Sequence, residues 1–297
     1  MSTKTYKVRF FAPTILTPTG ARFETSFFDL VMAEHDRQSA GEPRRITSIG
    51  GGEFIELRDL YVGHNRTWLK GVVAFLRNDA PHKRTAVGDE VEFDLQEGDS
   101  VLEKNHFILY KSNGLLVWQV NQTANHQSRL RDLVADYTGQ EGILQIADVL
   151  TREAVDLLNS GDLRRFDLQI LCPNDGAMDA NDFGAGLDSM ASQAPGAMMG
   201  LSFSAGRRAE GLPDAFKQKL DYWRRNRYAL NVKRLVVKLE DYDEPIDLFA
   251  ETVKDKVTVE MRGRYPLSAD IFGALNEAMD RQRGHIERFF GGIHSLE

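Results

Sequence analysis

The chain has 297 residues, with 37 Lys and Arg against 44 Asp and Glu, which gives a net charge of −7. Its single cysteine, Cys172, excludes an intramolecular disulfide framework and a cysteine-based zinc site. No apolar run approaches the ~20 residues of a membrane-spanning helix, and the polar N-terminus lacks the apolar core of a signal peptide. We therefore expect a cytoplasmic protein without a membrane segment, and a domain size of roughly 100–200 residues favours two domains.

The first half of the chain is predicted to consist mainly of strands. Residues 6–11 alternate apolar and basic side chains, which is typical of a strand with one buried face. Ser26 is expected to cap a short helix. Further strands are predicted at residues 44–49, 54–61 and 67–76. Two apolar segments, 107–110 and 115–118, flank Asn113 and Gly114, a pair that favours a type I′ turn and therefore predicts a β-hairpin.

The second half is predicted to mix helices and strands. An amphipathic helix at residues 127–137 is followed by Gly139 and Gly142, where we place a domain boundary. Strands are predicted at residues 143–149, 166–171, 201–205, 231–239 and 256–262, with helices after the cap residue Thr151 and at residues 213–228. Residues 174–200 are rich in Gly, Ala and Met and predict a long loop or a loose helix. A helix of ~22 residues from Ser268 ends the chain, and it packs either on its own sheet or at a dimer interface.

These elements predict an α+β protein with mostly antiparallel or mixed sheets and a long C-terminal helix. We expect an N-terminal domain at residues 1–139, a second domain with a basic helix at residues 140–266, and the C-terminal helix within residues 267–297. No internal repeat or low-complexity segment interrupts this order.

Motifs for catalysis or cofactor binding are absent from the sequence. No Gly is followed by Lys, so there is no Walker A loop, and the glycines at 50–52 lack the spacing of a dinucleotide site. Neither Glu-x-Lys nor Asp-x-Lys occurs, which disfavours the common restriction-nuclease core. The seven histidines are scattered, and His126, at a helix start, is expected to cap the helix or face solvent rather than to act in catalysis. We therefore expect no enzymatic activity, no metal site and no cofactor.

One segment departs from the acidic average. Residues 207–238 contain ten basic and three acidic residues, a net charge of +7, so the rest of the chain carries −14. Within this basic block, Tyr222 and Trp223 lie beside arginines, whose planar guanidinium groups bind phosphate, and aromatic rings can stack on bases. The candidate DNA-binding residues are Arg207, Arg208, Lys217, Arg224, Arg225, Arg227, Lys233 and Arg234.

Two other interpretations of the basic block remain open at this point. The first places Tyr222 and Trp223 in the core and pairs the arginines with residues 240–260, which contain eight acidic residues and only two lysines. The second makes the block a surface for a protein partner. Residue counts alone do not separate either interpretation from contact with nucleic acid.

Four segments together carry a resemblance to a known family. They are the basic first strand, the hairpin and helix at residues 106–137 (HFILYKSNGLLVWQVNQTANHQSRLRDLVADY), residues 157–171 (LLNSGDLRRFDLQIL) and the C-terminal helix at residues 268–290. In this order they resemble the RexA-like phage-exclusion protein family. The resemblance implies a two-domain α+β protein with an RdgC-like DNA-binding fold, which dimerises and contacts DNA through a basic surface without catalytic residues.

We therefore predict a homodimer that binds double-stranded DNA without sequence preference in phage exclusion or antiphage defence. The alternative is a non-enzymatic sensor or interaction subunit that recognises a phage or defence-system protein. A metal-dependent nuclease, with carboxylates assembled from distant segments, is the least favoured hypothesis.

Overall fold

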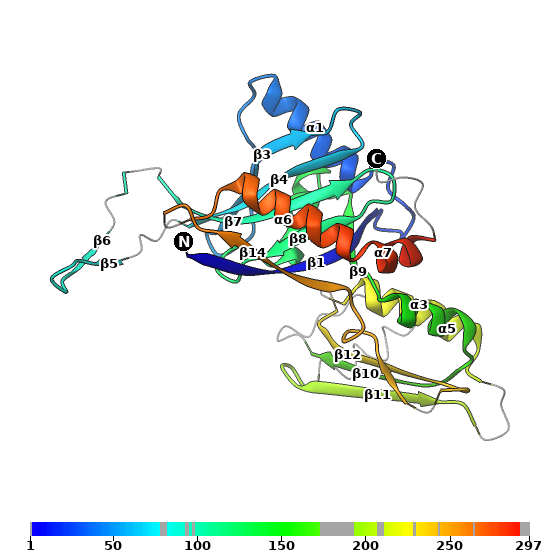
Figure 1. Cartoon of the computed structure of the whole chain (residues 1–297). Helices are drawn as coiled ribbons and strands as arrows, with labels where there is room; N and C mark the ends of the chain where they lie inside the picture. Colours follow the sequence, from blue (N-terminus) through cyan, green and yellow to red (C-terminus); the bar gives the residue numbers. More distant parts are fainter. Residues whose placement is uncertain are drawn as a thin grey trace. The chain divides into compact units, whose positions relative to one another are not determined.

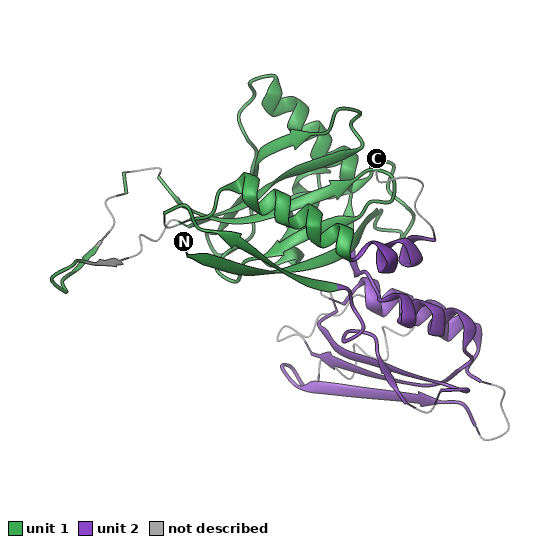
Figure 2. Cartoon of the chain, in the orientation of Figure 1, with its two compact units in different colours: residues 1–144, 254–281, 294–297 green, residues 145–253, 282–293 purple. Residues whose placement is uncertain are grey.

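The computed structural model describes residues 2–77, 82–92, 95–96, 99–172, 193–206, 211–227, 230–242, 244–263 and 265–291. They form an α+β fold with antiparallel sheets, which confirms the predicted fold class. The chain divides into two compact units (Figure 2). Among the described residues, unit 1 contains 2–144 and 254–281, and unit 2 contains 145–253 and 282–291. Each unit combines segments distant in sequence, whereas the predicted domains, 1–139, 140–266 and 267–297, are consecutive.

Unit 1 is built on an antiparallel sheet with the strand order β14-β1-β8-β7-β4-β3-β2 (Figure 1). Its strands are β1 (Thr3–Leu16), β2 (Ile46–Ser48), β3 (Phe54–Val62), β4 (Trp68–Arg77), β7 (Val101–Tyr110), β8 (Leu116–Val120) and β14 (Lys254–Glu260). Two short strands, β5 (His82–Arg84) and β6 (Glu90–Glu92), pair separately. The pairing of β1 with β14 joins the start of the chain to a segment near its end.

The described helices of unit 1 are α1 (Phe27–Ser39), the 3₁₀ turn η1 (Gln127–Arg129), α2 (Leu130–Tyr137) and α6 (Ser268–Arg281). Two of them, α1 and η1, begin at a residue whose side chain caps the helix. The hydroxyl of Ser26 accepts a hydrogen bond from the backbone N–H of Asp29 at 3.1 Å, as predicted for an N-cap. The ring of His126 accepts from the N–H of Ser128 at 3.3 Å, so its predicted capping role is confirmed.

The predicted hairpin at residues 105–120 is confirmed, but its turn type is wrong. β7 and β8 pair with Phe107 opposite Trp118, and a four-residue loop at 111–114 connects them. Of the loop residues, Gly114 has a positive φ, 71°, whereas a type I′ turn needs two such residues. The side chain of Asn113 accepts from the N–H of Leu115 at 2.9 Å, which stabilises the longer loop.

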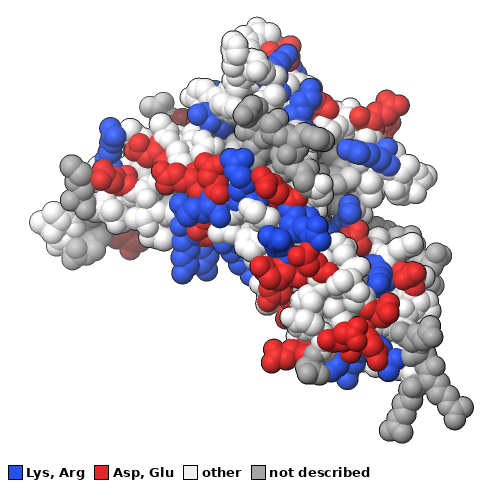
Figure 3. All heavy atoms as spheres, turned by 45° about the vertical axis from the view of Figure 1, so that its right-hand side comes forward, with Lys and Arg blue, Asp and Glu red and all other residues white. Residues whose placement is uncertain are grey.

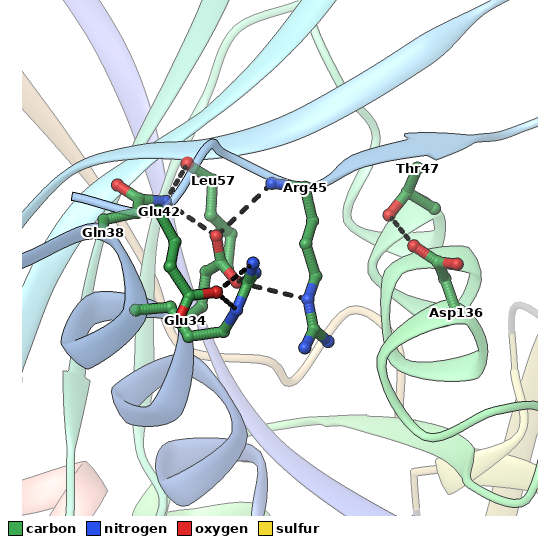
Figure 4. A network of polar contacts seen from close by, with 8 residues as sticks. Glu34, Gln38, Glu42, Arg45, Thr47, Leu57 and Asp136 are labelled. Carbon is green, nitrogen blue, oxygen red and sulfur yellow. Dashed lines mark hydrogen bonds and ion pairs between the residues drawn. The ribbon is translucent and has the colours of Figure 1, made fainter. Parts of the chain in front are cut away.

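A buried carboxylate connects α1 to the strands at the far end of the sheet (Figure 4). Glu34 is almost fully buried and accepts from the amide of Gln38 at 3.0 Å and from the backbone N–H of Arg45 at 3.4 Å. The guanidinium of Arg45 lies 3.6 Å from the same carboxylate. Thr47 on β2 donates to Asp136 on α2 at 2.7 Å. These polar contacts fix the segment before β2 between the two helices.

Unit 2 has a four-stranded antiparallel sheet with the order β11-β10-β12-β13 (Figure 1). Its elements are α3 (Arg152–Ser160), β10 (Leu163–Leu171), β11 (Met198–Ser204), α5 (Asp214–Arg225), β12 (Val232–Leu239), β13 (Ile246–Asp247) and α7 (Arg283–Phe290), and β9 (Ile143–Asp148) crosses the boundary between the units. One face of the sheet forms the core, where Phe166 stacks on Phe203 at 4.9 Å and contacts Trp223 at 5.3 Å.

Two predicted features of the second half need revision. The single C-terminal helix is present as two consecutive helices, α6 and α7, because Gln282 leaves the helical conformation with φ −96° and ψ 5°. The predicted loop at 174–200 lies mostly outside the described residues, but its last part belongs to β11. In the described part of the chain, no helix has both the length and the apolar character needed to cross a membrane.

His106 connects the sheet of unit 1 to the start of α6. It is buried, and its Nδ1 lies 2.7 Å from the amide oxygen of Gln119, to which it donates. Its Nε2 lies 2.9 Å from the hydroxyl of Ser268, the first residue of α6. Burial lowers the pKa of His106 from 6.5 to about 4, although the hydrogen bond to Gln119 opposes the shift. The ring is therefore neutral at pH 7.

We predict that His106 makes the stability of unit 1 sensitive to acid. Its pKa is lower in the folded chain than in the unfolded chain, so its contribution is complete above pH 6.5 and is lost as the pH falls toward 4. At about 1.4 kcal/mol per pH unit, the loss approaches about 3 kcal/mol. His106→Asn, which keeps a donor for Gln119, should therefore show a weaker pH dependence in urea unfolding between pH 7 and pH 5. Equal pH dependence in both proteins would contradict this role.

Candidate nucleic-acid interface

The described residues of the predicted DNA-binding set do not form one surface. Arg207 and Arg208 lie outside the described residues. The other six belong to unit 2: Lys217, Arg224 and Arg225 on α5, Arg227 two residues after it, and Lys233 and Arg234 on β12. Their surroundings decide which of them can reach a phosphate.

Arg224 is a structural residue of unit 2. Its side chain is only 8% exposed, and its guanidinium donates to the backbone oxygen of Asp148 at 2.8 Å and to Asp221 at 2.6 Å. Arg225 shares the carboxylate of Asp221 at 2.5 Å but is 42% exposed. Burial alone would raise the pKa of Asp221, yet the two guanidinium groups hold it below its usual value. Asp221 therefore stays ionised and retains both arginines.

Arg227 is also used within the fold. Its guanidinium donates to the buried carboxylate of Asp148 at 3.2 Å and lies over the ring of Phe249 at 3.9 Å. Removing this cation from Asp148 would leave a buried carboxylate without one of its donors. Arg227 therefore has a structural role in unit 2 that requires no ligand.

The remaining basic residues of the block lie on two sides of the small sheet. α5 covers the face that carries Phe166, because Trp223 packs on that ring. Arg234 is opposite Gln169 in the register, on the other face, and its Nε lies 3.8 Å from Asp247. Lys217 is on the helix side. A single flat ligand on unit 2 would therefore reach only part of the predicted block.

The first of the two other interpretations places Tyr222 and Trp223 in the core and pairs the arginines with residues 240–260. It applies to the basic block in part. Trp223 is buried, as that interpretation requires. The arginines do form ion pairs within the chain, but Asp221 and Asp148 supply most of the carboxylates rather than the acidic stretch at 240–260. Arg234 with Asp247 is an exception. The basic block thus contributes to folding.

A second group of cations lies in unit 1, where β1 and β14 pair. The antiparallel register places Lys7 opposite Lys256 and Arg9 opposite Lys254. These four residues, which we call the basic ladder, share one face of the sheet because the residues that alternate with them, such as Val8, are buried on the other face. Like charges directly opposite each other destabilise a sheet. Two successive rungs of the ladder have this arrangement.

The surroundings of the basic ladder suit an anion. Lys7, Lys254 and Lys256 are exposed, and successive rungs lie about 6.8 Å apart. The next rung continues with hydroxyl groups, because Thr5 and Thr258 face each other with their oxygens 3.0 Å apart. Lysine, arginine and threonine side chains are the usual contacts to phosphate oxygens in DNA complexes.

Acidic residues near the ladder have other positions. Asp255 lies between two ladder lysines in sequence but opposite Val8, on the other face, where it binds Arg281 of α6 at 3.0 Å. Glu260 shares the face of the ladder but lies two rungs from Lys256, opposite Thr3. Figure 3 shows one face of the molecule, on which acidic and basic side chains are interspersed. The ladder is therefore a local feature of a chain with negative net charge.

Protection of a sheet edge explains only half of the ladder. β14 is the end strand in the described sheet, and lysines on an edge strand discourage pairing with another sheet. This accounts for Lys254 and Lys256. It does not account for Lys7 and Arg9, because β1 is an interior strand between β14 and β8.

Sequence reasoning missed the ladder because its two halves are far apart in the chain. Lys7 and Arg9 were visible as a basic alternation, but Lys254 and Lys256 lie in a segment that is acidic overall. A cation at every second position is the signal that both strands share. Pairing of the two strands, which the sequence does not reveal, unites them.

We predict that Arg224 and Arg225 differ in their effect on folding although both bind Asp221. Arg224→Ala should lower the free energy of unfolding by about 3 kcal/mol, because it leaves the buried carbonyl of Asp148 without its donor and Asp221 with Arg225 alone. Arg225→Ala should lower it by less than about 1 kcal/mol, since this ion pair is solvent-exposed. Urea denaturation of both variants measures the difference, and equal losses would show that burial does not separate the two roles.

In the part of the chain that the structure describes, no three His, Cys, Asp or Glu side chains come together as metal ligands. The candidate site therefore rests on the charge and register of the basic ladder. Neither a protein-family model nor a curated protein matches the chain. The resemblance to the RexA-like family accordingly stays an expectation from the sequence pattern.

Proposed function

We propose that this protein binds double-stranded DNA without sequence preference, through contacts between the basic ladder and phosphate groups. The observation that carries the proposal is the like-charged rung of Lys7 and Lys256, both exposed, with Arg9 and Lys254 as the adjacent rung on the same face. A bound polyanion would convert this repulsion into attraction to the ligand.

The composition of the ladder supports binding without sequence preference. Lysine and arginine neutralise phosphates, and the neighbouring Thr5 and Thr258 add hydroxyl contacts to the same groups. Asn and Gln, which recognise adenine through two hydrogen bonds, are absent from these rungs. Contacts of this kind position DNA and do not distinguish its bases.

Residues of the predicted basic block have a smaller part in this proposal. Arg224 and Arg227 are held in the fold by buried partners, so we leave them out of the DNA surface. Lys217, Arg225, Lys233 and Arg234 stay candidates for weaker, additional contacts on unit 2. Arg207 and Arg208 stay predictions from the sequence alone.

The biological setting follows from the resemblance and not from the site. A RexA-like protein would act in phage exclusion or antiphage defence, in the cytoplasm and as a homodimer. An antiphage protein that binds any duplex has to recognise a physical property of DNA other than sequence, and the phosphate backbone is such a property. Recognition of a phage or defence-system protein is the alternative to be separated by experiment.

We predict that the central rung of the ladder determines both affinity and salt dependence. Lys7→Gln combined with Lys256→Gln should weaken binding to two unrelated duplexes by the same factor. Loss of two phosphate contacts should also make the log–log dependence of affinity on salt shallower by about 2, since each contact contributes about 0.9 to the slope. Fluorescence anisotropy at several salt concentrations measures both quantities.

A charge-matched variant separates a local site from a general effect of charge. Lys217→Gln combined with Lys233→Gln removes the same charge from unit 2. If this variant loses as much affinity as the ladder variant, net charge or the basic residues of unit 2 determine binding, and the ladder is not the principal site. If the wild-type protein does not bind DNA even at low salt, the proposed function is wrong. A protein partner then becomes the better hypothesis.

A further inference from the structure

β11 is the end strand of the four-stranded sheet in the described part of the chain. Its inner side pairs with β10 over its whole length, from Met198 opposite Leu171 to Ser204 opposite Arg165. Its other side has no strand partner among the described residues. An end strand of this kind directs every second backbone N–H and C=O outward.

The hydrogen bonds at the two ends of β11 show which residues point outward. The backbone oxygen of Ala197 accepts from Cys172, and the N–H of Ala205 donates to Arg164, so residues 197 and 205 face β10. Because direction alternates along an antiparallel strand, the odd-numbered residues between them also face β10. The outward backbone groups therefore belong to Met198, Gly200, Ser202 and Ser204.

The side chains of β11 do not protect this edge. The strand contains no charged residue and no proline, and three of the four outward residues are Gly or Ser. Met198 is 54% exposed. By contrast, the end strand of the large sheet, β14, carries Lys254 and Lys256. Natural sheets discourage edge-to-edge pairing with lysine or proline, and β11 lacks both.

Apolar side chains on the core face of β11 are also incompletely covered. Met199, Leu201 and Phe203 pack against the core of unit 2 but are only partly buried. A strand added outside β11 would cover their remaining exposed surface and extend the apolar layer. Association is thus favoured by both backbone hydrogen bonds and apolar burial.

We propose that β11 pairs antiparallel with β11 of a second copy of this chain, so that two four-stranded sheets become one continuous sheet. A twofold axis pairs the same strand with itself, which requires a strand that is complementary to its own reversed sequence. With the twofold axis at Leu201, β11 meets this condition because self-pairing brings no charged residues together and places Gly200 opposite Ser202.

This inference rests on the homodimer of the proposed function but not on DNA binding, so each can fail without the other. Gly200→Lys tests it directly. A Cβ at Gly200 meets no atom within 4 Å, so the lysine fits the monomer and places charge only at the edge. Gln169→Lys is the matched control, because Gln169 is the partner of Gly200 on the interior strand β10 and faces the same side.

Sedimentation of the full-length proteins without DNA gives the oligomeric state. Wild type and Gln169→Lys should have the mass of two chains, whereas Gly200→Lys should have the mass of one with an unchanged circular dichroism spectrum. A dimer that persists in Gly200→Lys would overturn the β11 interface while leaving the homodimer intact. A monomeric wild type would overturn both.

Cross-linking provides a second test that does not depend on disruption. Cys172 is the only cysteine and is buried, so a new cysteine at the edge is the accessible thiol. Gly200→Cys, Ser202→Cys and Ser204→Cys, examined one at a time under oxidation, should form a disulfide-linked dimer most readily at the position closest to the twofold axis. Equal cross-linking of Gln169→Cys, or none at any edge position, would contradict the pairing.

Discussion

The pairing of β1 with β14 is the contact on which unit 1 depends. Its register is set by burial, because Val8 on β1 and Val257 and Val259 on β14 must face the core. A shift by one residue would expose these side chains. The same register forces Lys7 opposite Lys256 and leaves the repulsion between them unrelieved within the pair. The basic ladder is therefore a consequence of the hydrophobic core, and the anionic ligand proposed above would offset the repulsion between Lys7 and Lys256.

Unit 2 illustrates the opposite relation between sequence and charge. Its arginines are close together in sequence and suggest a binding surface, yet the fold uses three of them, Arg224, Arg225 and Arg227, to bind Asp148 and Asp221. Asp148 lies 76 residues before Arg224, so no local window of sequence could identify this partner. In the folded chain, the run of arginines in unit 2 thus stabilises the fold. The candidate binding surface is formed instead by β1 and β14, two strands that are distant in sequence.

What the sequence predicts well is local. Ser26 and His126 cap helices through contacts two or three residues away, and alternation of apolar residues locates most strands to within a few positions. The turn after Tyr110 was predicted in the wrong class, because the bond from Leu115 to Asn113 favours a longer loop. Three features depend on pairings between distant segments: the strand order, the division of each unit among separate parts of the chain, and the basic ladder. Those pairings are decided by the core as a whole, and no single segment encodes them.

Pairing of two copies would change what a weak cationic surface can do. One ladder offers four charges, and each phosphate contact made without base recognition adds only a modest, salt-sensitive free energy. If both ladders of a dimer bind the same duplex, the second contact is intramolecular, with an effective concentration set by the geometry of the dimer. A chain with a net charge of −7 can hold DNA through such repeated local contacts while the rest of its surface repels the backbone. Affinity for DNA would then depend on dimer formation. The uncharged edge at β11 would form the dimer, and the charged face of β1 and β14 would contact the phosphates.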